Sequence, residues 1–580
     1  MSSIISSVLL FSVASSAMGF RPCPLLGPAY PPFTLNIDEP EVAQTLKWLT
    51  GNFTELVDTN TGPNGDVKAT TSFSIALFSS DKGNTDEEPF FWQFHHTSPE
   101  LKKTSKDAIV VNKDSIYGIG GLTEVFTIWS LLINGDDQIF DEPVTKYLPE
   151  LNTTDLKSKA KKDPTSVAAW EDITVGQLAS HLSGLARDYC VKDLSLSKSA
   201  EKAGLPKSTT KQDCCDKTSK CTTADLLKHL ATRPPVAPAG MTPGYSNLAF
   251  QVLGYIVEKG TGKSFEETLQ STILDKLGMK QTSVYAPKDT SAGVIPVSEE
   301  ASGWSAHSLV EKSSRSMFSS TKDLSIAGQA ILKSTLLTHA QTRRWLKPLS
   351  HTSNPKNSIG APWVIYSDGK YPNTSMVDVY TVLSNEDHDD GLYSSYLGLV
   401  PDYGVGYAIL SADTVSPADL NAHADYVEPV QEAIVKLSLK QALNNYGGKY
   451  EAANSSIVIN GDKYPGLYID GFTSNGVNFR ETLAELLGIK KEKNLSIRLY
   501  PTQRIDKSGD GSKQAFRAVL QDKTELADAD TPTCVSWLDV DKFQYNGHGL
   551  DELIFTLDKK GKAVEVEIPS LEVTLKKSSK

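Results

Sequence analysis

Apolar residues repeat at helical spacing in the stretch that follows the glycine pair Gly120–Gly121. The spacing of three to four residues predicts a buried helix, and Asn134–Gly135 supplies a stop signal. A strand is expected just before the glycine pair, over 115–119. A glycine turn between a strand and a buried helix leaves the first backbone N–H groups of the helix open to an anion, and it commonly carries a nucleophile. The repeating apolar residues are Leu122, Val125, Phe126, Trp129 and Leu132.

The pattern on either side of this helix predicts a domain of mixed strands and helices. Apolar runs over 72–80 and 90–98 are joined by a polar loop, so we expect an antiparallel hairpin. Thr174 is a good N-cap for a helix that extends to about Leu182, with Gly184 as its stop. Further helices are expected over 248–256, within 264–285 and over 316–333, further strands over 377–383, 393–400 and 405–411, and a long helix over 417–444.

Residues 449–580 differ from the rest of the chain because they contain only strand-length apolar runs separated by turns. This pattern predicts an all-β domain, either a small barrel or a sandwich. We therefore divide the chain into a leader 1–19, a Pro-rich arm 20–71, a mixed domain 72–446 and a β domain 447–580. The strands expected in the β domain are 456–460, 495–500, 516–520, 553–557 and 563–568.

The composition narrows the classes of partner. A net charge of −12, with no basic stripe interleaved with aromatic residues, argues against a nucleic-acid partner. Beyond the first 19 residues, no apolar run approaches the roughly 20 residues that span a bilayer, so no membrane partner is expected. No Cys or His motif indicates a metal site, and no cofactor is expected. A small-molecule ligand or substrate is the partner that we expect.

Residues 1–19 are typical of a secretory signal, with a short apolar core and a small-x-small pattern before Phe20. The alternative is a buried N-terminal helix. Six cysteines, which allow up to three disulfides, and five N-x-S/T glycosylation acceptors agree with secretion. We expect Cys23 in the arm to bridge Cys534 in the tail, and Cys190 to pair with one of the remaining three. Those three are Cys214, Cys215 and Cys221, and the acceptors are Asn52, Asn152, Asn373, Asn454 and Asn494.

Four motifs carry a resemblance to a known family. They are the segments 136–151 and 173–184, the turn Tyr245–Asn247 and the strand 393–401. Together they are similar to the serine β-lactamase and penicillin-binding-protein-like superfamily, and most similar to its class C-type esterase branch. The resemblance covers residues 72–440 and implies an α/β (α+β) fold with an antiparallel sheet flanked by helices. The arm and the β-rich tail resemble a secreted fungal subgroup with a lipocalin-like C-terminal domain.

The resemblance also implies a site at the start of the buried helix. The superfamily uses a Ser-x-x-Lys pair, one helical turn apart, so that the amine takes the hydroxyl proton of the nucleophile. In this chain Gly121 stands at the serine position and Glu124 at the lysine position. The facing strand of the superfamily carries a Lys-Ser-Gly type of motif, and this chain reads Val382–Ser384 there. The glycine pair before the lid segment is replaced by Arg315–Ser316.

These departures predict the loss of standard serine-hydrolase chemistry. Gly121 has no side chain with which to form an acyl-enzyme. Tyr245 corresponds to the general base of the superfamily, but its pKa stays near about 10 without lysine neighbours and rises beside a carboxylate. Thr123, as a substitute nucleophile, is displaced roughly 200° around the helix from the serine position. His388 is a candidate for the histidine of the facing strand, and His181 is expected to be structural.

Two classes of function remain, an enzyme-derived protein and a non-catalytic binding protein. In the first class, a repurposed cleft is formed by Glu124, Tyr245 and Asn247, and Arg315 reaches into it. The protein then acts on a secondary metabolite as a tailoring esterase, transferase or cyclase. In the second, Glu124 and Arg315 form a salt bridge that fills an abandoned site, and the fold only binds. Thr123 and His388, together with Arg315, are the candidate substrate-binding residues.

Overall fold

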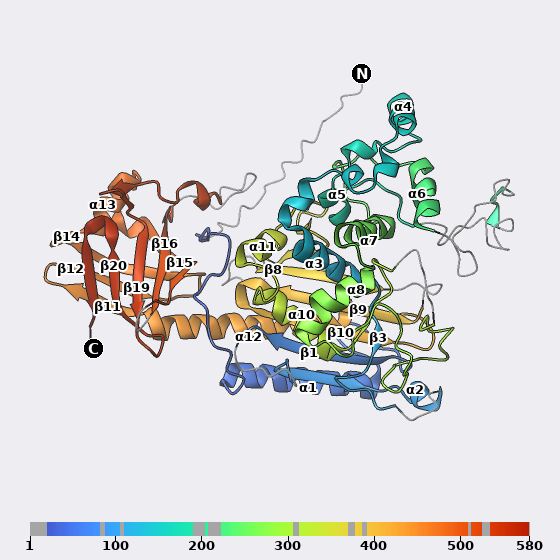
Figure 1. The fold of residues 1–580 in the computed structure, drawn as a ribbon. Helices are drawn as coiled ribbons and strands as arrows, with labels where there is room; N and C mark the ends of the chain where they lie inside the picture. Colours follow the sequence, from blue (N-terminus) through green and yellow to red (C-terminus); the bar gives the residue numbers. More distant parts are fainter. Residues whose placement is uncertain are drawn as a thin grey trace, which may run out of the picture. The chain divides into compact units, whose positions relative to one another are not determined.

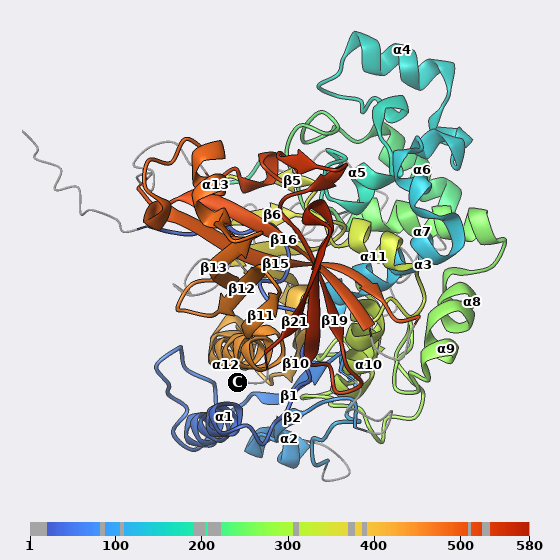
Figure 2. The same cartoon turned by 90° about the vertical axis from the view of Figure 1, so that its left-hand side faces the viewer.

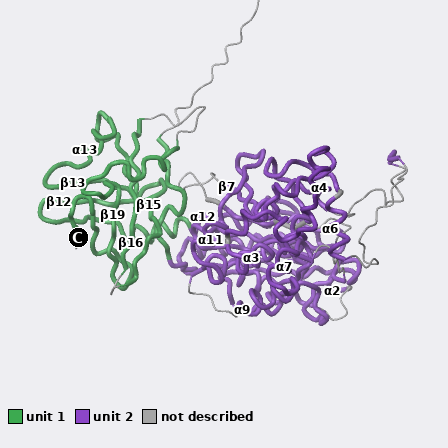
Figure 3. Tube along the Cα trace, turned by 45° about the horizontal axis from the view of Figure 1, so that its top comes forward, with its two compact units in different colours: residues 1–33, 369–376, 435–580 green, residues 34–368, 377–434 purple. Residues whose placement is uncertain are grey.

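The structure is a computed structural model that divides into two compact units (Figure 3). The first unit, which Figure 3 labels unit 2, contains residues 34–368 and 377–434. The second, which Figure 3 labels unit 1, combines the N-terminal segment up to Phe33 with the chain from Val435 onward. The residues that the structure describes are 20–81, 88–104, 109–188, 203–206, 222–305, 312–368, 377–385, 391–508, 512–524 and 534–578.

The first unit is built on an eight-stranded antiparallel sheet, counted over the described residues, with the strand order β2-β1-β10-β9-β8-β7-β6-β5. The predicted hairpin is confirmed, because β1 and β2 pair antiparallel with Phe73 opposite His96. The strands are β1 (Ser72–Ser79), β2 (Trp92–His96), β5 (Ser350–His351), β6 (Asn357–Ile359), β7 (Val364–Asp368), β8 (Val377–Asn385), β9 (Tyr393–Val400) and β10 (Val405–Ala412).

Helices cover both faces of this sheet, and the alternation of side chains along β1 shows why. Phe73 packs against Phe53 on one face, where α1 (Pro40–Thr59) lies beside β1 and β2 (Figures 1 and 2). Phe78 points to the other face and contacts α10 (Thr321–Leu332) at Gly328, where an added Cβ would lie 2.3 Å from the ring. Every residue of β1 is buried, as expected for a strand between two helical layers.

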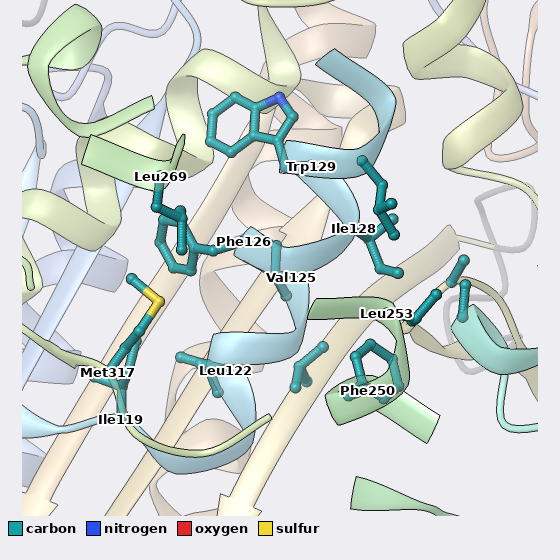
Figure 4. Packing of buried hydrophobic residues seen from close by; sticks show 14 of the residues in the cluster. Ile119, Leu122, Val125, Phe126, Ile128, Trp129, Phe250, Leu253, Leu269 and Met317 are labelled. Carbon is teal, nitrogen blue, oxygen red and sulfur yellow. The ribbon is translucent and has the colours of Figure 1, made fainter. Parts of the chain in front are cut away.

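The predicted central helix is confirmed as α3 (Thr123–Gly135), which follows a 3₁₀ turn, η1 (Gly120–Leu122). Its first ten residues are all buried, so it is surrounded on every side by the core of the first unit. Figure 4 shows Leu122 and Phe126 at this helix among Phe250, Leu269 and Met317. The preceding strand β3 is shorter than expected, Tyr117–Gly118, because Ile116 instead bonds to Ala292 through its backbone N–H.

The Thr174 N-cap is confirmed, with a capping box to Gln177, but the helix it begins is short. This helix, α5 (Val175–Ala179), does not extend to Leu182, because His181 adopts a φ of 57°. The other helices of the first unit are α2 (Pro99–Thr104), α4 (Thr154–Lys162), α6 (Thr223–Thr232), α7 (Asn247–Thr261), α8 (Phe265–Leu269), α9 (Asp275–Leu277) and α11 (His339–Trp345). The helix expected over 316–333 is β4 (Phe318–Ser319) followed by α10, with Ser320 as N-cap.

The long helix α12 (Asn421–Tyr446) contains the division between the units, after Ile434. In the second unit the strand order is β12-β11-β21-β20-β19-β16-β15-β13-β14, and a further pairing of β12 with β13 closes an antiparallel barrel. Tyr446, Phe516 and Phe555 pack against one another in its core. The strands are β11 (Gly448–Ala452), β12 (Ser455–Asn460), β13 (Leu467–Ser474), β14 (Val477–Asn478), β15 (Leu495–Asp506), β16 (Ser512–Asp522), β19 (Glu552–Leu557), β20 (Ala563–Ile568) and β21 (Val573–Lys577).

The expectation that the tail holds only strands is wrong in one place, because α13 (Phe479–Leu486) is a helix capped by Asn478. The short pair β17 (Gln544–Tyr545) and β18 (His548–Gly549) stands apart from the barrel sheet. Across the described residues, no helix has the length and apolar character that a membrane span requires.

The N-terminal segment of the second unit is fixed to the barrel by the predicted Cys23–Cys534 disulfide. The backbone N–H of Cys23 also donates to Oε1 of Gln521 at 2.8 Å, and the Tyr30 hydroxyl donates to the Tyr464 carbonyl at 3.4 Å. The two ends of the chain therefore fold together in one unit. The other four cysteines, Cys190, Cys214, Cys215 and Cys221, lie outside the described residues.

Candidate functional site

The turn before α3 positions the residue that the superfamily motif would make a nucleophile. Gly120 adopts a φ of 45°, in the left-handed region that favours glycine, and it starts the 3₁₀ turn. The hydroxyl of Ser395, on β9, donates to the Ile119 carbonyl at 2.7 Å and fixes this turn against the sheet. Gly121 follows, buried and without a side chain. The expected architecture of the site is present, but the hydroxyl it would display is absent at this position.

Glu124 lies in the first turn of α3 and is only 1% exposed. A carboxylate is favoured here by the helix dipole. Its Oε2 lies 3.5 Å from Nε2 of His181, whereas Oε1 is buried without a hydrogen-bond partner among the described groups. The alternative in which Glu124 pairs with Arg315 is thus corrected, since the side chain that faces the Glu124 carboxylate is His181. Arg315 acts instead on Tyr245, whose pKa its charge lowers.

His181 is a member of this site and more than a packing residue. It is 7% exposed, and its left-handed φ of 57° turns the ring toward Glu124 and Tyr245. Its Nδ1 lies 3.3 Å from the backbone N–H of Ser246. Since an N–H can only donate, Nδ1 is the acceptor and the neutral ring carries its proton on Nε2. Nε2 is also the ring atom that lies 3.5 Å from the Glu124 carboxylate.

The turn Tyr245–Asn247 forms the opposite side of the site. Ser246 caps α7 by accepting from the Ala249 N–H at 3.0 Å, which fixes its two neighbours. The Tyr245 hydroxyl donates to Oδ1 of Asn247 at 3.0 Å, and Nδ2 of Asn247 donates to Oδ1 of Asp188 at 2.5 Å. Tyr245 and Asn247, both predicted from the sequence, are therefore brought together with Glu124.

Two side chains enclose the Tyr245 ring. The His181 ring lies 4.7 Å from it between centroids, and the Arg187 guanidinium lies 4.6 Å from its centroid. Arg187 also pairs with Asp188 at 3.2 Å. We name this group of neighbouring residues the Glu124–Tyr245 site, and its members are Gly121, Glu124, His181, Arg187, Asp188, Tyr245 and Asn247.

The pKa of Tyr245 is raised well above its ordinary value of 10. Burial is the largest cause, and the Glu124 carboxylate adds to it, while Arg315 and Arg187 oppose it. The Tyr245 side chain is 38% exposed overall, but the partners of its hydroxyl are buried. We therefore assign the rise in its pKa to the surroundings of the hydroxyl. The sequence predicted a raised pKa from the carboxylate alone. Tyr245 consequently keeps its proton at neutral pH and is a poor general base.

Other candidate residues fall elsewhere. The Thr123 hydroxyl is fully buried and accepts from the Met317 N–H at 3.2 Å, which commits it to the core. His388 and Asn373 lie outside the described residues. Of the other glycosylation acceptors, Asn152 and Asn454 are exposed, Asn494 ends a 3₁₀ turn, and Asn52 lies within α1. In the described ranges, no group of three or more His, Cys, Asp or Glu side chains is arranged to hold a metal ion.

Sequence reasoning missed three members of the site. His181 was assigned to structure, and Arg187 and Asp188 were not singled out. A usable signal existed, because Arg187–Asp188 is a charged pair directly after the buried segment that ends at Ala186. Its partners Tyr245 and Asn247 come from some 60 residues later in the chain, with a sequence separation of 59 between Asp188 and Asn247. The charge pair alone did not indicate which turn it contacts.

Comparison with protein families gives two matches that follow the two units. The family model described as "Beta-lactamase" matches residues 103–432, more than half of the chain. The model described as "Beta-lactamase-like-like, C-terminal domain" matches residues 438–579. The second match falls on the barrel, including the last part of α12.

Individual relatives extend over both regions. A β-lactamase-like protein of Arthroderma benhamiae is 28% identical over 545 residues, covering 87% of each chain. A probable hydrolase of Cochliobolus lunatus is 24% identical over 548 residues, covering 85% of this chain and 84% of the relative. Among solved structures, a class C β-lactamase mutant aligns with 69% of this chain and 99% of its own, with 16% identity and a TM-score of 0.48. With the first family model spanning most of the first unit, the chain belongs to the β-lactamase family, in the serine β-lactamase and penicillin-binding-protein-like superfamily.

Proposed function

We propose that this protein is a secreted member of the β-lactamase family that binds a small organic molecule in the Glu124–Tyr245 site and forms no acyl-enzyme there. The observation that carries the proposal is Gly121, which occupies the turn before α3 and has no nucleophilic side chain. The neighbouring Thr123 hydroxyl does not substitute for it, because it is buried against Met317.

The charges around Gly121 support the same proposal. A lysine at position 124 would take a proton from a nucleophile, whereas Glu124 is a buried carboxylate that faces Nε2 of His181 at 3.5 Å. Tyr245 retains its own proton, since its pKa is raised. Neither a nucleophile nor a tyrosinate base is therefore supplied by these residues.

Covalent labelling tests this proposal. The full-length protein is incubated with a fluorophosphonate and, separately, with a penicillin, and its intact mass is measured. We expect no adduct, while a class C β-lactamase labelled in parallel gains one. An adduct mapped to any residue of the Glu124–Tyr245 site would overturn the proposal.

A second candidate function is acid–base catalysis without a covalent intermediate, with Glu124 as the general base. It is favoured by one observation, the buried Oε1 of Glu124 that has no partner among the described groups. The matched test is Glu124→Gln, which keeps the size of the side chain and removes its basicity. Catalysis is supported if the wild type turns over a hydroxylated metabolite and this variant does so about 10²-fold more slowly or worse. Equal turnover would remove Glu124 from the mechanism.

Secretion is tested separately. We propose that residues 1–19 are removed and that the mature chain begins near Phe20, which would place the Cys23–Cys534 bridge in an oxidising compartment. Expression in a fungal host followed by N-terminal sequencing of the medium should give a chain that starts at or near Phe20. Retention of the protein inside the cells with an intact Met1 would contradict secretion.

A further inference from the structure

Arg187 is the charged member of the Glu124–Tyr245 site that faces solvent. Its side chain is 61% exposed, whereas the carboxylates of Glu124 and Asp188 belong to side chains that are 2% and 10% exposed. The Tyr245 hydroxyl bonds to the buried Asn247 and Glu124, so the exposure of Tyr245 falls on its ring. A molecule that approaches from solvent therefore meets a guanidinium and an aromatic ring before it meets either carboxylate.

The Arg187 side chain is held in one place by its neighbours. Its backbone carbonyl accepts from the N–H of Asn247 at 2.9 Å, which fixes the main chain to the start of α7. Its guanidinium lies over the Tyr245 ring, and its Nε lies 3.2 Å from Oδ2 of Asp188. Asp188 is held in turn by Nδ2 of Asn247 at 2.5 Å. An exposed arginine usually loses rotamer freedom when it binds a ligand, and this one has already lost much of that freedom.

The contacts of Arg187 leave one edge of its guanidinium available. The group is planar and carries N–H donors on all three nitrogens, with no acceptor. Asp188 faces Nε, and within the part of the chain that the structure describes, neither Nη1 nor Nη2 forms a hydrogen bond or an ion pair. Two parallel N–H donors on one edge match the two oxygens of a carboxylate.

The charges around Tyr245 favour an anion at this edge. Arg315 adds a second guanidinium charge, and its charge and that of Arg187 both lower the pKa of Tyr245. The opposing charges of Glu124 and Asp188 are buried, so the charge presented to solvent beside the ring is positive.

An apolar side chain lies next to the same ring. Val236 is 64% exposed, and its Cγ2 would lie 3.8 Å from a Cβ placed on Gly244, the residue before Tyr245. The Val236 N–H donates to the Gly184 carbonyl at 2.9 Å, which fixes this segment to the loop that carries His181. Apolar surface is thus available beside the cation.

We propose that the Glu124–Tyr245 site selects a ligand with a carboxylate on an apolar body, and that Arg187 binds this carboxylate through Nη1 and Nη2. The Tyr245 ring and Val236 contact the apolar body. This inference rests on the proposed function, because it names the class of small organic molecule that the site binds without forming an acyl-enzyme. It makes Arg187 the residue that determines specificity.

The test compares two probes that share a ring and a planar head group and differ in charge. Ligand-observed NMR measures the dissociation constants of benzoate and benzamide for the full-length protein at neutral pH. We expect benzoate to bind at least about fivefold more tightly, the upper range for an exposed ion pair with good geometry. The preference should shrink as the ionic strength rises from about 0.01 M to about 1 M. Equal affinities, or no measurable binding of benzoate, would overturn the inference.

Substitutions then locate the preference. Arg187→Gln removes the charge and should abolish the preference for benzoate. Arg187→Lys keeps the charge without the fork and should retain only part of it, and this variant carries the test if Arg187→Gln does not fold. Arg504→Gln is the matched control, because Arg504 is 59% exposed and also pairs with one carboxylate, that of Glu552. It should leave both dissociation constants unchanged. A full preference for benzoate in Arg187→Gln or in Arg187→Lys would overturn the inference.

The outcomes separate this inference from the proposed function. Equal binding of benzoate and benzamide without any covalent adduct removes the inference and leaves the proposed function standing. An adduct with a fluorophosphonate or a penicillin in the Glu124–Tyr245 site removes the proposed function and the inference together. A preference for benzoate that depends on Arg187, without an adduct, supports both.

Discussion

The imidazole of His181 and the carboxylate of Glu124 face each other at 3.5 Å, with the two side chains 9% and 2% exposed. Replacing His181 by Ala leaves this carboxylate buried without the donor that the ring supplies. We expect the free energy of unfolding to fall by about 2–3 kcal/mol, because a buried charged group is left without a polar neighbour. Chemical denaturation of the first unit measures the loss.

His339→Ala is the matched control, because His339 lies exposed at the start of α11 and its loss should change stability by no more than about 0.5 kcal/mol. The double variant His181→Ala/Glu124→Gln should be more stable than the sum of its single changes predicts, since no unpaired charge remains. If His181→Ala is as mild as His339→Ala, the pair does not contribute to stability.

The close approach of α10 to the sheet gives a prediction about packing. A Cβ added at Gly328 would lie 2.3 Å from Cζ of the Phe78 ring, so Gly328→Ala forces the helix or the ring to move. We expect a loss of about 1–3 kcal/mol in the free energy of unfolding. Gly260→Ala, near the end of α7, meets nothing within 4 Å and should be neutral or stabilising by up to about 1 kcal/mol. Similar losses in both variants would contradict the argument.

Local patterns predicted the central part of the fold well, because burial and periodicity agree there. The helix after Gly121 and the hairpin that starts at Ser72 were recognised, since their side chains are packed on nearly every face. The predicted ends of helices were wrong where a contact with a distant residue determines the backbone conformation. Leu182 is outside its expected helix because His181 takes a left-handed conformation to reach Glu124, and no local signal specifies that contact.

The site was predicted only as far as motifs fix positions. Gly121, Glu124 and Tyr245 were recognised because the surrounding motif dictates which position each occupies. One alternative paired Glu124 with Arg315 by charge, and the structure places a histidine beside Glu124 instead. Charge complementarity along a sequence predicts neither the reach of a side chain nor the tautomer of a ring, which depend on backbone groups such as the Ser246 N–H.

Acid should destabilise the first unit through His423. This ring is 1% exposed beside Phe53 and Phe73, and burial lowers its pKa from 6.5 to about 4, although the neighbouring Asp419 opposes the shift. Between these two pH values the unfolded chain binds a proton that the folded chain refuses. Stability should therefore fall as the pH drops from 6.5 to 4, by about 3 kcal/mol for this group, at about 1.4 kcal/mol per pKa unit.

The variant His423→Leu isolates this contribution. Its free energy of unfolding should depend less steeply on pH between 4 and 6.5 than that of the wild type, while part of the slope persists through His95, whose pKa burial also lowers to about 4. Leu at the exposed His351 is the control and should leave the slope unchanged. Parallel pH profiles for the wild type and His423→Leu would show that the buried ring does not govern acid stability.

The Cys23–Cys534 bridge should hold the N-terminal segment on the barrel, because it closes a loop across a sequence separation of 511 residues. Cys23→Ser should lower the free energy of unfolding of the second unit by about 2–5 kcal/mol, chiefly through the greater freedom of the unfolded chain. Thermal unfolding and limited proteolysis of the segment around Tyr30 both report this loss. Cys534→Ser and the double variant should behave like Cys23→Ser, since each removes the same bridge. A Cys23→Ser protein as stable and as protease-resistant as the wild type would mean that the contacts of Tyr30 and Gln521 suffice to dock the segment.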